Sequence, residues 1–89
     1  MPIIGYIVQY SNEDDYTIYH GYMKLYKQFS SALEHAQELM RAFLLTQGDG
    51  IQIFRSAKPT KKECDEQGSV VVFESRDYIV WIDAVVCEN

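Results

Sequence analysis

Long apolar runs, a cleavable leader and paired cysteine motifs are all missing from this 89-residue sequence. No apolar run approaches the roughly 18 residues of a membrane-spanning helix, so we expect no association with a membrane. No basic region followed by a cleavage site occurs in the N-terminal stretch, which argues against a signal peptide. The two cysteines, Cys64 and Cys87, form no CxxC pattern. We therefore expect two thiols rather than a disulfide, and a cytoplasmic location.

Basic residues are scarce, because 8 Lys and Arg face 13 Asp and Glu, for a net charge of −5. This sign disfavours general binding to nucleic acid or to anionic membranes. One mixed segment holds the only basic cluster together with three acids: Arg55, Lys58, Lys61, Lys62, Glu63, Asp65 and Glu66. A single-stranded nucleic-acid binder, with tyrosines that stack on bases, is the third functional hypothesis. The signature of an RNA-recognition sheet is missing.

Catalytic and metal-binding patterns are also absent. The glycines of segment 48–50 follow a helical pattern and lack the lysine of a phosphate-binding loop. The acids Glu13–Asp15 are adjacent, whereas a calcium loop alternates its ligands. The residue types that zinc prefers have no ligand spacing: His20, His35, Cys64 and Cys87. We predict no catalytic residue, no metal and no cofactor, although a catalytic set that assembles only in space would leave no such pattern.

What the sequence does contain is the composition of one globular domain over residues 1–89, with 47% hydrophobic and 24% charged residues. Strand-like patterns occupy segments 3–10, 16–23 and 51–55, and a long hairpin fills segment 70–86 with a polar break at 74–77. One helix separates the second and third strands. The order β-β-α-β-β-β predicts an α+β fold: an antiparallel sheet of about five strands with one helix packed on one face.

The helix is predicted to begin at an N-cap supplied by Ser30 and Ser31 and to end at about Thr46 or Gln47, before the glycines of segment 48–50. Ser31 and Glu34 have the spacing of a capping box. An apolar stripe with helical periodicity is expected to face the sheet: Ala32, Leu33, Ala36, Leu39, Met40, Phe43 and Leu44. Segment Ser56–Gly68 is predicted to be an exposed, charged loop, in which Cys64 would react readily with thiol reagents.

The last strand, Tyr78–Val86, is apolar on both of its faces. Tyr78, Val80, Ile82, Ala84 and Val86 lie on one face, and Ile79, Trp81 and Val85 lie on the other, where Asp83 is the one polar member. A strand with one solvated face normally alternates apolar and polar residues. One helix covers only one face of a sheet, so the other face requires a second cover. The sequence pattern leaves open which of the two rows meets the helix.

We therefore predict that the protein is a non-enzymatic interaction module that self-associates as a homodimer. Binding to another protein is a further expectation. The candidate interface residues are Tyr19, Ile79, Trp81 and Val85. A second hypothesis is a small-ligand binder or small enzyme with a pocket lined by some of the seven tyrosines. A competing explanation for the second apolar face is that segment Ser56–Gly68 folds back over it.

Overall fold

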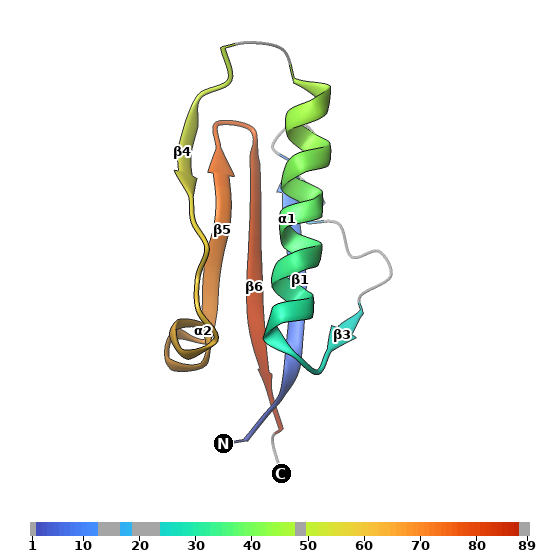
Figure 1. Cartoon of the computed structure of the whole chain (residues 1–89), viewed down its shortest axis with the longest axis vertical. Helices are drawn as coiled ribbons and strands as arrows, with labels where there is room; N and C mark the ends of the chain where they lie inside the picture. Colours follow the sequence, from blue (N-terminus) through green and yellow to red (C-terminus); the bar gives the residue numbers. More distant parts are fainter. Residues whose placement is uncertain (1, 13–16, 19–23, 48–49, 88–89) are drawn as a thin grey trace.

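The computed structural model describes residues 2–12, 17–18, 24–47 and 50–87, which form one antiparallel sheet and two helices (Figure 1). The strands lie in the order β2-β1-β6-β5-β4, and the short strand β3 also pairs with β1. This arrangement confirms the predicted α+β fold and its sheet. The prediction of a single helix is wrong, because a second helix lies between β4 (Ile53–Ser56) and β5.

The hairpin of β5 (Ser69–Ser75) and β6 (Tyr78–Val86) forms the middle of the sheet, as the sequence predicts. Its turn consists of the exposed residues Arg76 and Asp77, and the buried Ser75 hydroxyl donates to the Tyr78 carbonyl at 3.3 Å. A register shift between Val71 and Phe73 marks a bulge in β5. The bulge interrupts the alternation of the β5 side chains, so that the adjacent residues Val72 and Phe73 are both fully buried.

Strand β1 (Ile3–Asn12) pairs with β6 along its length, and its outer edge pairs with β2 (Thr17–Ile18) and β3 (Leu25–Tyr26). Gly5 permits the close approach of β3. A Cβ atom at this position would lie 2.7 Å from Leu25 Cδ1 and 2.8 Å from the Tyr26 carbonyl oxygen. Only glycine fits here without movement of a neighbour. The predicted second strand, 16–23, falls largely outside the described residues.

Helix α1 (Phe29–Thr46) begins earlier than its sequence pattern predicts. The cap residue is Gln28, which makes no side-chain cap hydrogen bond, so the capping box predicted at Ser31 and Glu34 is wrong. Phe29 explains the earlier start, because it is buried against Tyr6 in an edge-to-face contact with ring centroids 5.4 Å apart. Burial of this ring stabilises the first turn more than a hydroxyl cap would.

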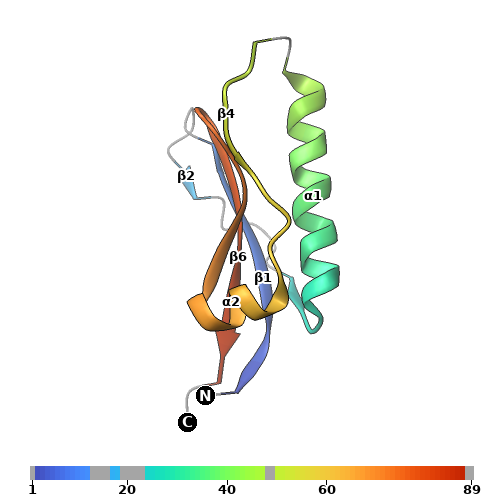
Figure 2. The same ribbon diagram turned by 60° about the vertical axis from the view of Figure 1, so that its left-hand side comes forward.

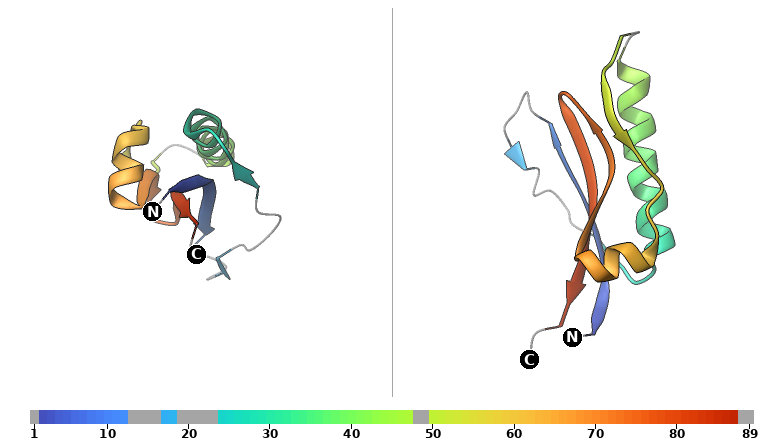
Figure 3. Two further views of the ribbon diagram at one scale, coloured as in Figure 1. Left: turned by 90° about the horizontal axis from the view of Figure 1, so that it is seen from below. Right: turned by 90° about the vertical axis from the view of Figure 1, so that its left-hand side faces the viewer.

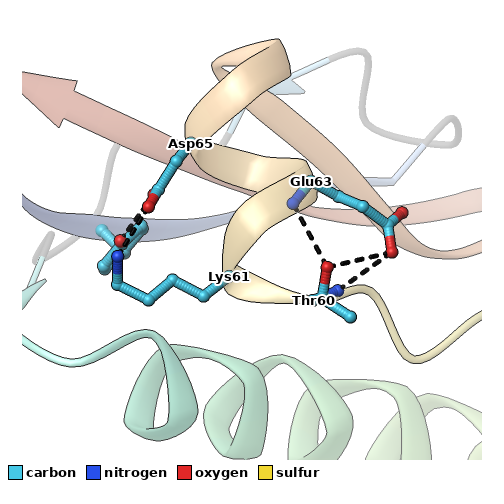
Figure 4. Close-up of polar contacts among 5 residues, drawn as sticks. Thr60, Lys61, Glu63 and Asp65 are labelled. Atoms are coloured by element: carbon cyan, nitrogen blue, oxygen red, sulfur yellow. Dashed lines mark hydrogen bonds and ion pairs between the residues drawn. The ribbon is translucent and has the colours of Figure 1, made fainter.

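Helix α2 (Lys61–Gln67) replaces most of the predicted loop. A capping box starts it: the Thr60 hydroxyl accepts from the Glu63 amide, and the Glu63 carboxylate accepts from the Thr60 amide (Figure 4). Gly68 ends it in the left-handed conformation, at φ 80°. Lys61, Lys62, Glu63 and Glu66 form the exposed face of α2, whereas Cys64 lies on its inner face.

Both helices pack on the same face of the sheet (Figures 2 and 3). Tyr78 stacks on Phe43 of α1, with ring centroids 4.3 Å apart, and Ile82 lies beneath α2, where its carbonyl faces the Cys64 thiol at 3.7 Å. The predicted helical stripe, including Leu39 and Phe43, belongs to or packs against this core. Neither helix in the described part of the chain is long and apolar enough to cross a membrane.

Candidate interaction surface

The face of the sheet opposite the helices carries the second row of apolar side chains that the sequence predicts. Strand register determines its members, because Gly5, Ile7, Gln9 and Ser11 of β1 pair with Val85, Asp83, Trp81 and Ile79 of β6. On the other side of β6, Ser69, Val71 and Glu74 of β5 pair with Asp83, Trp81 and Ile79. We call this surface the open face and define it by these residues: Ile7, Gln9, Ser11, Ser69, Val71, Glu74, Ile79, Trp81, Asp83 and Val85.

The apolar residues of the open face take no part in the core. The buried cluster and the residues packed against it include neither Ile79 nor Trp81 nor Val85, and each of these is half-buried by its neighbours on the sheet. No helix of residues 24–47 or 50–87 lies over them (Figure 3). In this part of the chain, nothing supplies the second cover that the apolar residues require.

A fixed carboxylate lies among these apolar side chains. Asp83 Oδ2 accepts a hydrogen bond from the Trp81 indole Nε1 at 3.2 Å and a second, short one from the Gln9 amide Nε2. All three side chains are half-buried. Two donors to one oxygen hold the indole and the carboxylate against the sheet, so this centre of the open face is ordered in advance of any contact.

Three of the four predicted interface residues lie together on this surface. Ile79, Trp81 and Val85 belong to one row of β6, and β6 is the middle strand of the sheet. Tyr19, the fourth, lies outside the described residues. The prediction missed Ile7 and Val71, whose apolar character was visible but whose place beside β6 follows from the register alone.

The helix-covered face contains a polar cluster of Tyr6, Lys61 and Asp65. The Tyr6 hydroxyl donates to Asp65 Oδ1 at 2.6 Å, and Lys61 Nζ lies 2.6 Å from Asp65 Oδ2 (Figure 4). Burial and the Asp65 hydrogen bond raise the pKa of Tyr6, whereas the hydrogen bonds from Lys61 and Tyr6 lower the pKa of Asp65. These contacts attach α2 to β1, so we interpret the cluster as structural.

Cys64 is not the reactive thiol that the sequence predicts. It lies at the centre of α2 with none of its surface exposed, and burial raises its pKa to about 11. A thiol attacks as its thiolate, so Cys64 is protected both by burial and by its protonation state. The reason for the error is the missed helix, which places Cys64 on the inner face of α2. Neither Cys64 nor Cys87 forms a disulfide.

The other candidate metal-binding and basic residues do not form a common site in the part of the chain that the structure describes. His35 Nδ1 shares a hydrogen bond with the Tyr26 hydroxyl at 3.0 Å, and His20 lies outside the described residues. Among residues 2–12, 17–18, 24–47 and 50–87, no three His, Cys, Asp or Glu side chains are placed to hold a metal. In the basic cluster, Lys61 and Lys62 form ion pairs with Asp65 and Glu66 within α2.

The described tyrosines do not line a common pocket. Tyr6 and Tyr78 are buried in the core, and Tyr10 and Tyr26 pack against it. A cavity of about 450 Å³ lies between β5 and the segment that leads from β4 into α2. Its lining contains no tyrosine and combines two basic groups, Arg55 and Lys58, with the acidic Glu63 and the neutral amide of Gln67.

Comparisons of the chain with models of protein families, with curated proteins and with solved structures found no match. Functional inference therefore rests on the open face and on the absence of a better-assembled site among the described residues.

Proposed function

We propose that this protein is a non-enzymatic interaction module that self-associates as a homodimer through the open face. One observation carries the proposal: α1 and α2 both cover the same face of the sheet, while the opposite face presents Ile79, Trp81 and Val85, which neither helix covers. Tyr6 and Ile82, the residues that α2 contacts, belong to the α1 side. The segment 56–68 is thus on the wrong side to act as the second cover, which removes the competing explanation.

The open face extends over the three neighbouring strands β1, β6 and β5. Its central residue, Trp81, lies beside Ile79 and Val71, and tryptophan is a residue type that often dominates the binding energy of protein contacts. Twofold pairing of identical sheets would cover Ile79, Trp81 and Val85 in both copies.

The other hypotheses have weaker support. A tyrosine-lined ligand site lacks a specific observation, because Tyr6 and Tyr78 are part of the core and Tyr10 and Tyr26 pack against it. Binding to single-stranded nucleic acid would require available cations, whereas Lys61 and Lys62 lie beside carboxylates of their own helix. Self-association would cover the second apolar row of β6, over which neither described helix lies.

The experiment measures mass and fluorescence against concentration. At tens of micromolar, light scattering should give about twice the 10.3 kDa of one chain. Trp81 is the only tryptophan, so its emission should shift to shorter wavelength with the same midpoint. Ile79→Lys should abolish both changes. Leu45→Lys is the matched control, since Leu45 is 87% exposed on α1, and it should leave both changes intact.

A monomer up to several hundred micromolar, with an unshifted Trp81 emission, would contradict the proposal. Equal loss of the dimer in Ile79→Lys and Leu45→Lys would place the contact elsewhere than on the open face.

A further inference from the structure

We propose that Asp83 restrains self-association through the open face and keeps the homodimer weak. The inference rests on the proposed function and concerns its regulation. It starts from the position of the carboxylate: Asp83 lies on the middle strand of the sheet, between Ile7 of β1 and Ser69 of β5 in the strand register. It is the one charged residue in the row that contains Ile79, Trp81 and Val85.

Two hydrogen bonds hold the Asp83 carboxylate in place on the open face. Trp81 Nε1 and Gln9 Nε2 both donate to Oδ2, and the three side chains are half-buried together on the sheet. A charged side chain at the rim of an interface turns toward solvent at little cost. Asp83 would instead enter the contact with its charge at a fixed place, and an unpaired charge that leaves water is costly.

No cation of the described residues neutralises Asp83. The ion pairs of this part of the chain, Lys61 with Asp65 and Lys62 with Glu66, lie within α2 on the other side of the sheet. On the open side, the strand register places Arg55 of β4 opposite Glu74 of β5, at the far edge from β1. Asp83 therefore contributes a net negative charge to the middle of the open face.

In a twofold-symmetric contact, the Asp83 charge would repel the same charge of the second copy. An isologous contact places the same patch on both partners, so a residue near the centre approaches its own counterpart. Two Asp83 carboxylates would then face each other between apolar side chains, in chains that each carry a net charge of −5. Like charges that meet across an interface oppose binding. The open face is thus self-complementary in apolar character and not in charge.

The test compares the dimerisation constants of Asp83 variants, measured by sedimentation equilibrium and by Trp81 emission. Asp83→Asn keeps an oxygen that accepts from Trp81 and Gln9, and it should strengthen dimerisation by about tenfold or more. If the Asp83→Asn variant folds poorly, Asp83→Thr replaces it, because threonine is uncharged and is favoured in strands. It should strengthen dimerisation by a similar factor. Asp83→Glu retains the charge and should remain as weak as the parent protein.

Glu38→Gln is the matched control for net charge. Glu38 is exposed on α1, on the opposite side of the sheet, so this variant should change dimerisation by less than about threefold. Raising the salt concentration from about 0.05 to 0.5 M should strengthen the dimer of the parent protein and affect Asp83→Asn less.

An Asp83→Asn dimer that is no tighter than the Glu38→Gln dimer would overturn the proposal. A weaker dimer would also overturn it, and would indicate that the carboxylate binds a cation of the partner. If no variant dimerises at any salt concentration, the proposed function fails as well. If Ile79→Lys abolishes a dimer that Asp83→Asn does not strengthen, the proposed function stands and the role of Asp83 alone is refuted.

Discussion

Replacement of Thr60 with alanine tests the least expected element of the fold, helix α2. A helix of seven residues is not stable alone, so it depends on its caps and on its packing. The Thr60 hydroxyl accepts the Glu63 amide at 3.2 Å, and the substitution removes this acceptor. Loss of such a cap costs about 1 kcal/mol. With a urea slope of about 1–2 kcal/mol/M, the denaturation midpoint should fall by about 0.5–1 M.

Ser31→Ala is the matched control, because the sequence assigns this residue the same capping role in α1. In the structure Ser31 lies inside the helix and is exposed, so its replacement should change stability by less than about 0.5 kcal/mol. Glu63→Gln should retain most of the stability, since glutamine also serves in a capping box. Equal losses for Thr60→Ala and Ser31→Ala would refute the assignment of the caps.

The rate at which a reagent labels the Cys64 thiol is a local measure of the opening of α2. Its thiol is fully buried by α2, so a thiol reagent reaches it only when α2 opens. In a Cys87→Ser background, Thr60→Ala should increase the labelling rate by about fivefold if the whole cost of about 1 kcal/mol appears in local opening. An unchanged labelling rate together with a lowered midpoint would show that α2 opens only when the whole domain unfolds.

Further predictions concern the core, the strand contact and pH. Phe43→Ala should cost about 3 kcal/mol, because the ring stacks on Tyr78, while Leu45→Ala on the exposed side should cost less than about 0.5 kcal/mol in the same urea titration. Gly5→Ala should cost about 1–3 kcal/mol by thermal or urea unfolding, since its Cβ would overlap the neighbouring strand; an unchanged midpoint would mean that β3 does not pack there. Burial raises the pKa of Cys64 from 9.0 to about 11 and that of Tyr78 from 10.0 to about 12. The unfolded chain loses these protons first, so stability should hold below about pH 9 and fall from there to about pH 12, and Cys64→Val should remove the first part of the fall.

The β5–β6 hairpin and α1 could be predicted because local pattern and tertiary need agree there. Apolar runs bounded by a polar turn specify β5 and β6, and helical spacing of Leu39, Met40 and Phe43 specifies α1. The start of α1 could not be predicted from Ser31, because burial of Phe29 against a strand 23 residues away in sequence decides it.

Helix α2 was missed although its signals are present. Thr60 and Glu63 have the same spacing as Ser31 and Glu34, and Gly68 follows at the right distance. The many charged residues of segment 56–68 favour the prediction of a loop. A helix of two turns has room for few apolar residues, so its apolar pattern is too short to indicate a helix. A single buried Cys64 is enough here, because Tyr6 also attaches Asp65 to the sheet. That hydrogen bond joins residues 59 positions apart, and no local pattern predicts it.

The two apolar rows of β6 differ in one charged residue. A helix over the row of Ile79 and Trp81 would bury the Asp83 carboxylate against the apolar stripe of α1, which contains no cation. The row of Tyr78, Val80 and Ile82 contains no charge, and in the structure it is the row that the helices cover. Burial of the Asp83 carboxylate against a second copy would be opposed for the same physical reason. Removal of the Asp83 charge should therefore affect contact with a second copy more than removal of any exposed charge on the helices.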